Sequence, residues 1–454
     1  MDGRSVKLDA RSAAFGFACG LAAYPLYQLV KQLRTNDEAP GPVKESTIRL
    51  MTRIAMQSGA VNLSQGFPNE APPTAMVCAA AGALLAGDSE AAAAAMAKKL
   101  AALVPAGKRK DALNQYSFPY GAPALRRAIE AYYKRWYPTV AADADANVTV
   151  VMGATEGFAA TIRALTEPGD VVAFFEPFHE LYPSQLAIFG LTPRAVTLTA
   201  GQDAWGFDER RLDAALAGAK LLLFNDPHNP TGHRFSEAER DAIARLCAKH
   251  DVVIVTDEIY EHMCFRGGPY ATLAARADCS DRVVVVNSIS KTAKATGWRI
   301  GWVVASAART AKIRAVHDQL VACCPTPLQH GVAALLDHPE TDETVLAEIA
   351  GEYEAKRDAL ATALARAGFG LGPTPAGSYY LFVTFDGVGA LAGLSPTDAA
   401  LKMTRDFKVA CVPGDNFYLG ASKATHGAKY LRFAFVRSLD VIADAAANLA
   451  KLPS

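Results

Sequence analysis

Five short runs of consecutive apolar, mostly β-branched residues constrain the fold of this chain more than any other feature. The segments between them have helical patterning. Strands that are apolar on both faces are buried on both faces, as in a parallel sheet that is covered by helices. The sequence therefore predicts an α/β architecture. The predicted strands are Val148–Met152, Val171–Phe175, Leu221–Asn225, Val252–Thr256 and Val283–Asn287.

Composition and charge exclude several classes of function. The 454 residues include 46 Lys and Arg against 46 Asp and Glu, and 51% are hydrophobic. That apolar content argues against a disordered chain, and the zero net charge argues against nucleic-acid binding, which relies on surplus Lys and Arg. The eight Cys have no CxxC spacing. We therefore expect no disulfide framework, no metal centre and a reducing, cytoplasmic location.

The N-terminal segment has two interpretations. Ser12–Val30 contains no charged residue and follows Arg4, Lys7 and Arg11, which is typical of a targeting or anchoring segment. Its glycines, proline and glutamine weaken it as a membrane helix. The other interpretation is an apolar arm that packs on the body or on a partner subunit. Organelle targeting or membrane tethering through residues 1–30 is therefore an alternative to the cytoplasmic location, and membrane contact is expected only if this segment is an anchor.

Chemically useful residues follow the carboxyl ends of the predicted strands, where open α/β sheets bind ligands. The small residues of Gly153–Gly157 can offer free backbone N–H groups to an anion. Lys291 lies just beyond an apolar strand, where burial favours the neutral, nucleophilic amine. Each feature also has an ordinary explanation, such as a turn, a helix cap or a surface lysine. The other strand ends carry His179, Asn229, Asp257 and Tyr260.

The order of these motifs resembles that of the class I and II aminotransferases, which are pyridoxal phosphate enzymes of fold type I. The resemblance is strongest to the branch with kynurenine, glutamine K and methionine aminotransferases. It implies a mostly parallel seven-stranded sheet in a large domain, with a smaller α+β domain. The motifs that carry it are NLSQGFP, NQYSFPYG, GATEG, EPFHELY, HNPTG, DEIY, SISKTAKATGWRIGW and YLRFAFV.

The resemblance also suggests how the chain divides into domains. An apolar arm and linker occupy residues 1–42, and residues 43–75 form the N-terminal part of the small domain. The large cofactor-binding domain spans 76–345, and the small C-terminal domain spans 346–454. Residues 88–110 are interpreted as a helical insertion, because the alanine-rich pattern of Ser89–Leu103 is followed by Pro105 and Gly107.

The same resemblance implies a role for each residue around the cofactor ring. Lys291 matches the lysine that binds pyridoxal phosphate as a Schiff base and moves the proton during catalysis. Asp257 matches the carboxylate that faces the pyridine nitrogen and keeps the ring protonated. Tyr260 and Asn229 match the groups that hydrogen-bond the ring 3′ oxygen. His179 stands where the family usually stacks Phe, Tyr or Trp on the ring, so we expect altered cofactor electronics.

A second group of residues matches the phosphate cradle of the family. Ala154 and Thr155 would bind the phosphate through backbone N–H groups, and Ser288 and Arg299 through their side chains. Tyr116 matches a phosphate ligand that reaches across from the second subunit. The resemblance therefore implies a homodimer with shared active sites.

The substrate site is implied in outline only. Arg432 matches the arginine that binds the substrate α-carboxylate with paired hydrogen bonds, Gly66 would place a backbone group nearby, and Asn229 also borders this site. The implied reaction moves an amino group from an L-amino acid (kynurenine, glutamine, methionine or similar) to a 2-oxo acid by a ping-pong mechanism. The alternative is a cysteine-S-conjugate β-lyase or related lyase on the same fold. The donor stays open because Ala322-Cys323 replace an aromatic pair that is usual in kynurenine-type enzymes.

Overall fold

The computed structural model describes residue 64 and residues 71–104, 113–338 and 346–453. The predictions for Ser12–Val30 and for Gly66 lie outside the described residues. No helix within the described ranges is long and apolar enough to cross a membrane.

Seven strands form one sheet in the order β1-β9-β8-β7-β6-β2-β3. All neighbours are parallel except at β9, which is antiparallel to both β1 and β8. The predicted mostly parallel seven-stranded sheet is therefore confirmed, and each of the five predicted strands is present with ends shifted by no more than two residues. The strands are β1 (Val148–Val151), β2 (Val171–Glu176), β3 (Thr192–Thr197), β6 (Ala219–Asn225), β7 (Val253–Asp257), β8 (Val283–Ser288) and β9 (Gly301–Val304).

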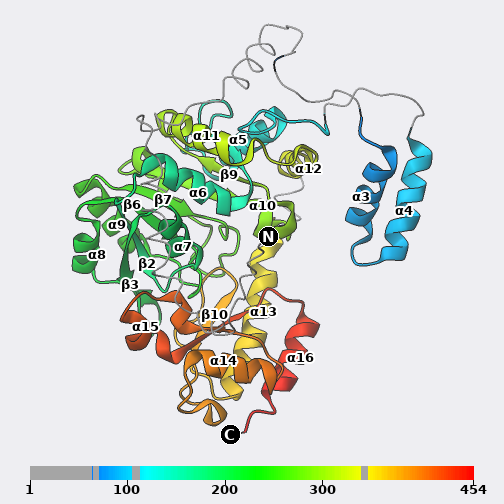
Figure 1. Ribbon diagram of the computed structural model, residues 1–454. Coiled ribbons are helices and arrows are strands. Elements are labelled where there is room, and N and C mark those ends of the chain that lie inside the picture. The colour runs from blue at the N-terminus through cyan, green and yellow to red at the C-terminus, as the bar shows by residue number, and fades with distance from the viewer. Residues whose placement is uncertain (1–63, 65–70, 105–112, 339–345, 454) are drawn as a thin grey trace, which may run out of the picture. The chain divides into compact units, whose positions relative to one another are not determined.

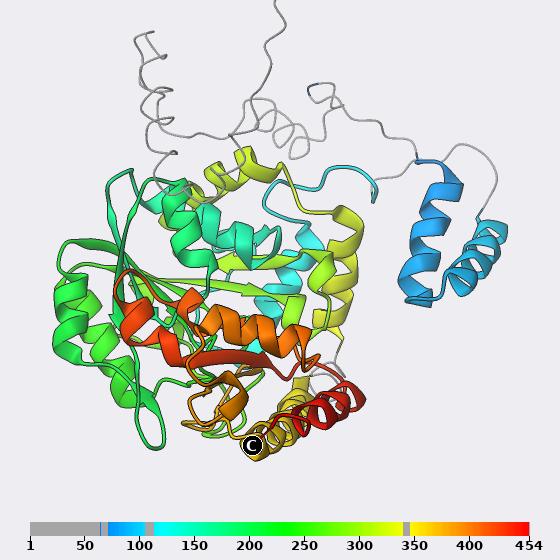
Figure 2. The same ribbon diagram turned by 60° about the horizontal axis from the view of Figure 1, so that its bottom comes forward.

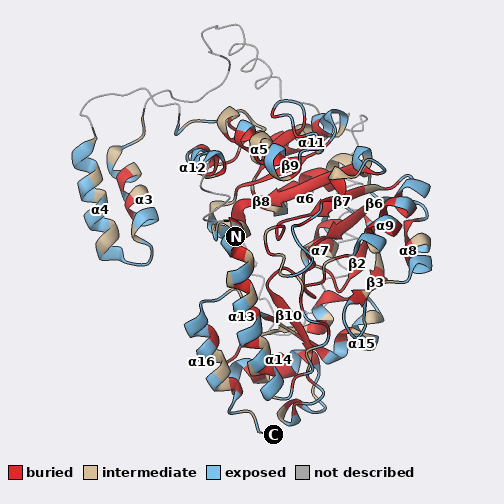
Figure 3. Ribbon diagram, turned by 180° about the vertical axis from the view of Figure 1, so that it is seen from behind, coloured by how far each residue is buried: buried red, intermediate tan, exposed pale blue. Residues whose placement is uncertain are grey.

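Successive residues of the central strands enter two different cores. In β2, Val172 and Phe174 belong to one buried cluster, while Ala173 and Phe175 belong to the other. Side chains alternate across a strand, so both faces of the sheet are covered. Figure 3 shows the same arrangement, with buried strands inside and exposed helix surfaces outside. This double burial explains why the strands have uninterrupted apolar sequences.

The helices of this part cover the sheet (Figure 1). The helix α6 packs on β8, β9 and α11, while α5 packs on β1 and α12. A capping box begins α9: the hydroxyl of Ser236 accepts the Glu239 N–H, and the Glu239 carboxylate accepts the Ser236 N–H. These helices are α5 (Pro123–Trp136), α6 (Gly153–Leu165), α7 (Leu181–Ile188), α8 (Glu209–Leu216), α9 (Glu237–Lys249), α10 (Ile289–Thr292), α11 (Ala307–Val321) and α12 (Thr326–Asp337); a small ribbon joins β4 (Thr199–Ala200) and β5 (Trp205–Gly206).

The C-terminal part forms an antiparallel sheet in the order β10-β12-β11. In Figure 2 this part of the chain, yellow to red, is turned toward the reader. Arg432 of β12 lies opposite Phe382 of β10 and Val412 of β11. The domain boundary at residue 345 stays a prediction. The elements are α13 (Ala347–Arg366), β10 (Tyr380–Thr384), α14 (Pro396–Arg405), β11 (Val412–Pro413), α15 (Ser422–Thr425), β12 (Tyr430–Ala434) and α16 (Leu439–Leu449).

Two further helices, α3 (Thr74–Ala86) and α4 (Glu90–Leu103), pack against each other. Ser89 caps α4 by accepting the N–H of Ala92 at 3.3 Å. The backbones approach closely at Gly82, where a Cβ atom would meet the carbonyl oxygen of Ala93 at 2.5 Å. The helix predicted over Ser89–Leu103 is confirmed, whereas its status as an insertion stays a prediction.

Candidate active site

The carboxyl ends of β6, β7 and β8 bring the central candidate residues together. Asn225 and Asp257 are register partners at the ends of β6 and β7, and the Asn225 side-chain amide donates to the Asp257 carbonyl oxygen at 3.0 Å. Ser288 ends β8 and caps α10, which carries Lys291. The parallel arrangement thus places an amide, a carboxylate and an amine at one edge of the sheet.

Asp257 is a buried carboxyl group with one oxygen left open. The hydroxyl of Tyr182 donates to Oδ2 at 2.8 Å, while Oδ1 has no hydrogen-bond partner among the described residues. Burial raises the pKa of Asp257 to about 6, and the Tyr182 hydroxyl opposes that rise. A protonated ring nitrogen placed at Oδ1 would satisfy this oxygen and offset the cost of its burial.

The motif SISKTAKATGWRIGW contains two lysines, Lys291 and Lys294, and of these Lys291 faces the candidate site. Its Nζ lies 5.7 Å from the centre of the Tyr379 ring. Lys294 is 59% exposed and forms an ion pair with Glu352 at 2.8 Å. These contacts favour Lys291 over Lys294 as the candidate nucleophile, and its role stays a prediction.

A chain of hydrogen bonds connects the Asp257 backbone with Arg432. The side-chain oxygen of Asn225 accepts the backbone N–H of Asn229 at 2.6 Å, and the side-chain oxygen of Asn229 accepts Nη1 of Arg432 at 3.0 Å. Arg432 lies far away in sequence, on β12, yet it reaches this edge of the large sheet. An anion held by Arg432 would therefore lie beside the Asn229 side chain.

Aromatic rings surround the Arg432 guanidinium. Its central carbon lies 4.4 Å from the ring centre of Tyr380 and 4.7 Å from that of Phe417. The hydroxyl of Tyr260 is 3.4 Å from that of Tyr380. Burial raises the pKa of Tyr260 well above its usual range, so its hydroxyl stays protonated as a donor. The rings fix the plane of the guanidinium before any ligand arrives.

The turn between β1 and α6 is shaped for an anion. Gly153 has φ +71°, and a Cβ atom there would overlap the guanidinium of Arg299. Ala154 and Thr155 lie in the first turn of α6, where backbone N–H groups have no helical partner. A guanidinium pressed against a helix N-terminus favours a dianion such as a phosphate group. The Ser288 hydroxyl lies nearby in the fold, but it donates to the Ile300 carbonyl oxygen at 2.9 Å and caps α10.

His179 is a neutral imidazole in this structure. Burial first, and then the positive charge of Arg432, lower its pKa to about 4. Its Nδ1 accepts the backbone N–H of Leu181 at 3.1 Å, so the remaining proton lies on Nε2. The ring centre is 5.8 Å from that of Tyr182, at 32°. The ring thus lies next to the phenol that contacts Asp257, and its expected place over the cofactor stays a prediction.

Tyr116 lies on a loop that other side chains hold in place. Its side chain is 54% exposed. On either side of it, the Gln115 carbonyl oxygen accepts the hydroxyl of Thr326 at 2.6 Å, and the Ser117 hydroxyl accepts the Gln329 amide at 3.1 Å. The loop therefore presents Tyr116 at the surface from a fixed backbone, as an intersubunit contact would require.

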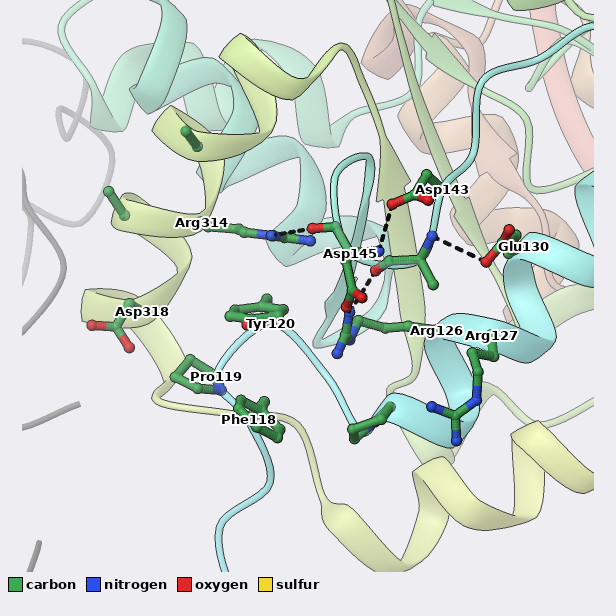
Figure 4. A pocket seen from close by; sticks show the side chains of 14 residues that line it. Phe118, Pro119, Tyr120, Arg126, Arg127, Glu130, Asp143, Asp145, Arg314 and Asp318 are labelled. Carbon is green, nitrogen blue, oxygen red and sulfur yellow. Dashed lines mark hydrogen bonds and ion pairs between the residues drawn. The ribbon is translucent and has the colours of Figure 1, made fainter. Parts of the chain in front are cut away.

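A pocket of about 910 Å³ is lined in part by Phe118, Pro119 and Tyr120, which follow this loop in the sequence (Figure 4). Arg126 and Arg314 approach the ring of Tyr120, with guanidinium carbons 4.8 and 4.0 Å from its centre. Both arginines also donate to backbone carbonyl oxygens around Asp145. Of the residues in the described part of the chain that we assigned to the cofactor or substrate, none lines this pocket. The arginines serve to hold the loop.

The described residues fit pyridoxal phosphate, the cofactor that the resemblance implies. The open oxygen of Asp257 suits the pyridine nitrogen, and the Gly153 turn with Arg299 suits the phosphate. The sequence did not single out Tyr182 and Asn225. The Tyr182 hydroxyl orients the Asp257 carboxylate, and the Asn225 side-chain oxygen holds the backbone N–H of Asn229. Asn225 is the last residue of β6, and Tyr182 follows β2 within the motif EPFHELY, so their positions beside strand ends were a usable signal. Within the described ranges, no group of three or more His, Cys, Asp or Glu could hold a metal ion.

Comparisons with known proteins show which family the chain resembles. The profile of "Aminotransferase class I and II" matches residues 74–447. The "Probable N-succinyldiaminopimelate aminotransferase DapC" of Mycobacterium tuberculosis is 33% identical over 75% of this chain and 78% of its own. "Kynurenine--oxoglutarate transaminase 3" of Mus musculus is 29% identical over 88% of this chain and 86% of its own.

A solved structure shows the same fold. The Escherichia coli protein YbdL, whose structure is described as identifying a methionine aminotransferase function, superposes with a TM-score of 0.69 at 29% identity, covering 92% of this chain and all of its own. The family match spans most of the chain and includes every described candidate residue. The chain therefore belongs to the class I and II aminotransferases and is a pyridoxal phosphate-dependent aminotransferase of fold type I.

Proposed function

We propose that this aminotransferase takes its amino group from an L-amino acid such as kynurenine, glutamine or methionine and passes it to a 2-oxo acid. The observation that carries the proposal is the Arg432 guanidinium, bound to Asn229 at 3.0 Å and flanked by the Tyr380 and Phe417 rings. This arrangement would bind an α-carboxylate in an aromatic setting, which suits an apolar or aromatic side chain. The names of the kynurenine and methionine relatives support the same substrate class.

Pyridoxal phosphate supplies a reactive aldehyde and a ring that withdraws electrons from the bound amino acid. Lys291 would hold the cofactor through its amine and, when that amine is free, would serve as the general base and acid that moves a proton. Asp257 would keep the ring nitrogen protonated through Oδ1, which has no hydrogen-bond partner among the described residues. Tyr260 and Asn229 would hydrogen-bond the ring 3′ oxygen, and the neutral His179 ring would cover one face of the cofactor.

The proposed substrate and phosphate contacts orient both half-reactions in one pocket. Arg432 binds the α-carboxylate of the amino acid and then that of the 2-oxo acid, which is why ping-pong kinetics are expected. The backbone of Ala154 and Thr155, with Arg299, holds the phosphate. Ser288 supports this cradle from the cap of α10.

The proposal includes a homodimer with shared active sites. Tyr116 is exposed on its fixed loop and would reach the phosphate of the second subunit. Sedimentation of the purified protein, together with Tyr116→Phe, tests this: we expect a dimer whose cofactor affinity falls when the hydroxyl is removed. A stable monomer with full activity would contradict the shared site.

A panel of amino donors tests the proposed substrate class. Kynurenine, glutamine, methionine and aspartate are each assayed with 2-oxoglutarate, pyruvate and 2-oxo-4-methylthiobutyrate, with Lys291→Ala as the inactive control. We expect the first three donors to exceed aspartate in kcat/KM. A preference for aspartate would contradict the proposal. Release of pyruvate from a cysteine S-conjugate without any 2-oxo acid acceptor would instead indicate the β-lyase alternative.

A further inference from the structure

A buried histidine outside the catalytic residues joins the phosphate-binding turn to the Tyr116 loop. His317 of α11 is fully buried. Its Nδ1 lies 3.0 Å from Oε1 of Glu156, and its Nε2 lies 2.8 Å from the Pro119 carbonyl oxygen. Glu156 lies in the first turn of α6, next to the residues that would bind the phosphate. Pro119 lies three residues after Tyr116.

The chemistry of these contacts decides where the protons are. A carbonyl oxygen accepts hydrogen bonds and cannot donate, so Nε2 of His317 carries a proton. The second contact then needs a proton either on Nδ1 or on the Glu156 carboxyl group. The other oxygen of Glu156 already accepts the Met152 N–H at 3.0 Å, and the N-terminus of α6 favours a carboxylate ion. The proton therefore belongs on Nδ1.

The neighbouring guanidinium of Arg314 does not pair with the Glu156 carboxylate. Arg314, one turn earlier on α11, gives its N–H groups to Thr149, Val148 and Asp145 instead. The buried imidazole and the Glu156 carboxylate are thus each other's close ionic partner at this position. A buried charge pair is maintained when its remaining hydrogen-bonding groups are also satisfied, as the Pro119 and Met152 contacts provide.

We propose that His317 is held as an imidazolium, protonated on both nitrogens, and acts as a positioning residue that fixes the phosphate turn of one subunit relative to the Tyr116 loop offered to the other. This inference rests on the proposed roles of the α6 turn and Tyr116. It adds an element that the catalytic residues do not include: a single ionised side chain that links both halves of the phosphate site.

The protonation state can be measured without any activity assay. In holoenzyme with ¹⁵N-labelled histidine, NMR at pH 7.5 should show both ring nitrogens of His317 protonated, with the signal assigned by its loss in His317→Gln. In Glu156→Gln the ionic partner is gone, so the same signal should change to that of a neutral imidazole. A neutral His317 in the unmodified protein would overturn the proposal.

Cofactor binding tests the positioning role. We expect His317→Gln to weaken pyridoxal phosphate binding by about 10- to 100-fold, because it loses charge-assisted hydrogen bonds on both sides. His250→Gln is a matched control, since His250, which directly follows α9, forms a similar pair with Asp213 of α8 at 2.6 Å. The affinity of this variant for pyridoxal phosphate should be unchanged.

The outcomes separate this inference from the proposed function. If His317→Gln binds the cofactor as tightly as the unmodified protein, the positioning role is wrong. If His317→Gln fails to fold, Glu156→Gln gives the same test, because it removes the charge and keeps the shape. If the unmodified protein binds no cofactor, the proposed function is wrong, and the same NMR measurement on the cofactor-free protein still decides the protonation state.

Discussion

Replacing Asp257 with asparagine is expected to stabilise the cofactor-free protein while it nearly stops transamination. The folded protein holds this carboxyl 2% exposed, and burial raises its pKa from 3.8 to about 6. Well below pH 3.8 the group is protonated in both the folded and the unfolded chain, so it does not change the free energy of unfolding. As the pH rises, the unfolded chain releases the proton first, so the free energy of unfolding falls until the folded carboxyl has also ionised, above pH 6.

The size of the effect follows from these two values. At pH 7.5 the ionised carboxylate costs the folded protein about 3 kcal/mol relative to a group with unperturbed proton affinity, and roughly half of that at pH 5. An asparagine never ionises and can still accept the Tyr182 hydroxyl. The Asp257→Asn apoprotein should therefore be more stable than the unmodified apoprotein, by about 3 kcal/mol at pH 7.5 at most.

Urea unfolding of the cofactor-free proteins at pH 5 and pH 7.5 measures this difference. Asp203→Asn, at an exposed aspartate, is the control and should change neither value. Pyridoxal phosphate should reverse the order, because only the carboxylate gains an ionic partner at the ring nitrogen. If the unmodified apoprotein is the more stable one at pH 7.5, or if the difference does not grow with pH, the account of this carboxyl is wrong.

Two further predictions concern the substrate and phosphate contacts. Arg432→Lys should raise KM for both the amino acid and the 2-oxo acid by about 10- to 100-fold, because one ammonium cannot donate two parallel hydrogen bonds. Steady-state kinetics measure this, and an unchanged KM would show that Arg432 does not bind the substrate. Gly153→Ala should weaken cofactor binding at least about tenfold in a fluorescence titration, because the Cβ would displace Arg299. The control is Gly169→Ala, which also has a positive φ but no atom within 4 Å of the added Cβ, and equal affinities for the two variants would refute the steric argument.

The strands were predictable because their burial is recorded in the sequence itself. A run such as Val283–Asn287 has no polar face, so only a sheet that is covered on both sides can accept it. The strand ends shifted by no more than two residues because hydrogen bonding, rather than side-chain polarity, determines where a strand stops. The antiparallel direction of β9 was not foreseen from the residues alone, since Gly301–Val304 has no pattern that distinguishes the two directions.

Local motifs identified the candidate residues, but not the contacts that orient them. His179, Asn229 and Asp257 stand out because each follows a strand end. Tyr182 is a phenol on a helix and could equally be a core residue; only the fold shows that its hydroxyl meets Asp257 at 2.8 Å. Contacts between residues that are distant in sequence, such as that of Arg432 with Asn229, depend on how the C-terminal sheet meets the large one.

The direct test of the central claim is a mass measurement on Lys291. The purified protein is incubated with pyridoxal phosphate, reduced with borohydride and digested, and the peptides are analysed by mass spectrometry. We expect a phosphopyridoxyl tag on Lys291 and none on Lys294, which is bound to Glu352. A tag on Lys294 alone, or an untagged Lys291 in protein that has otherwise bound the cofactor, would contradict the assignment on which the proposed mechanism depends.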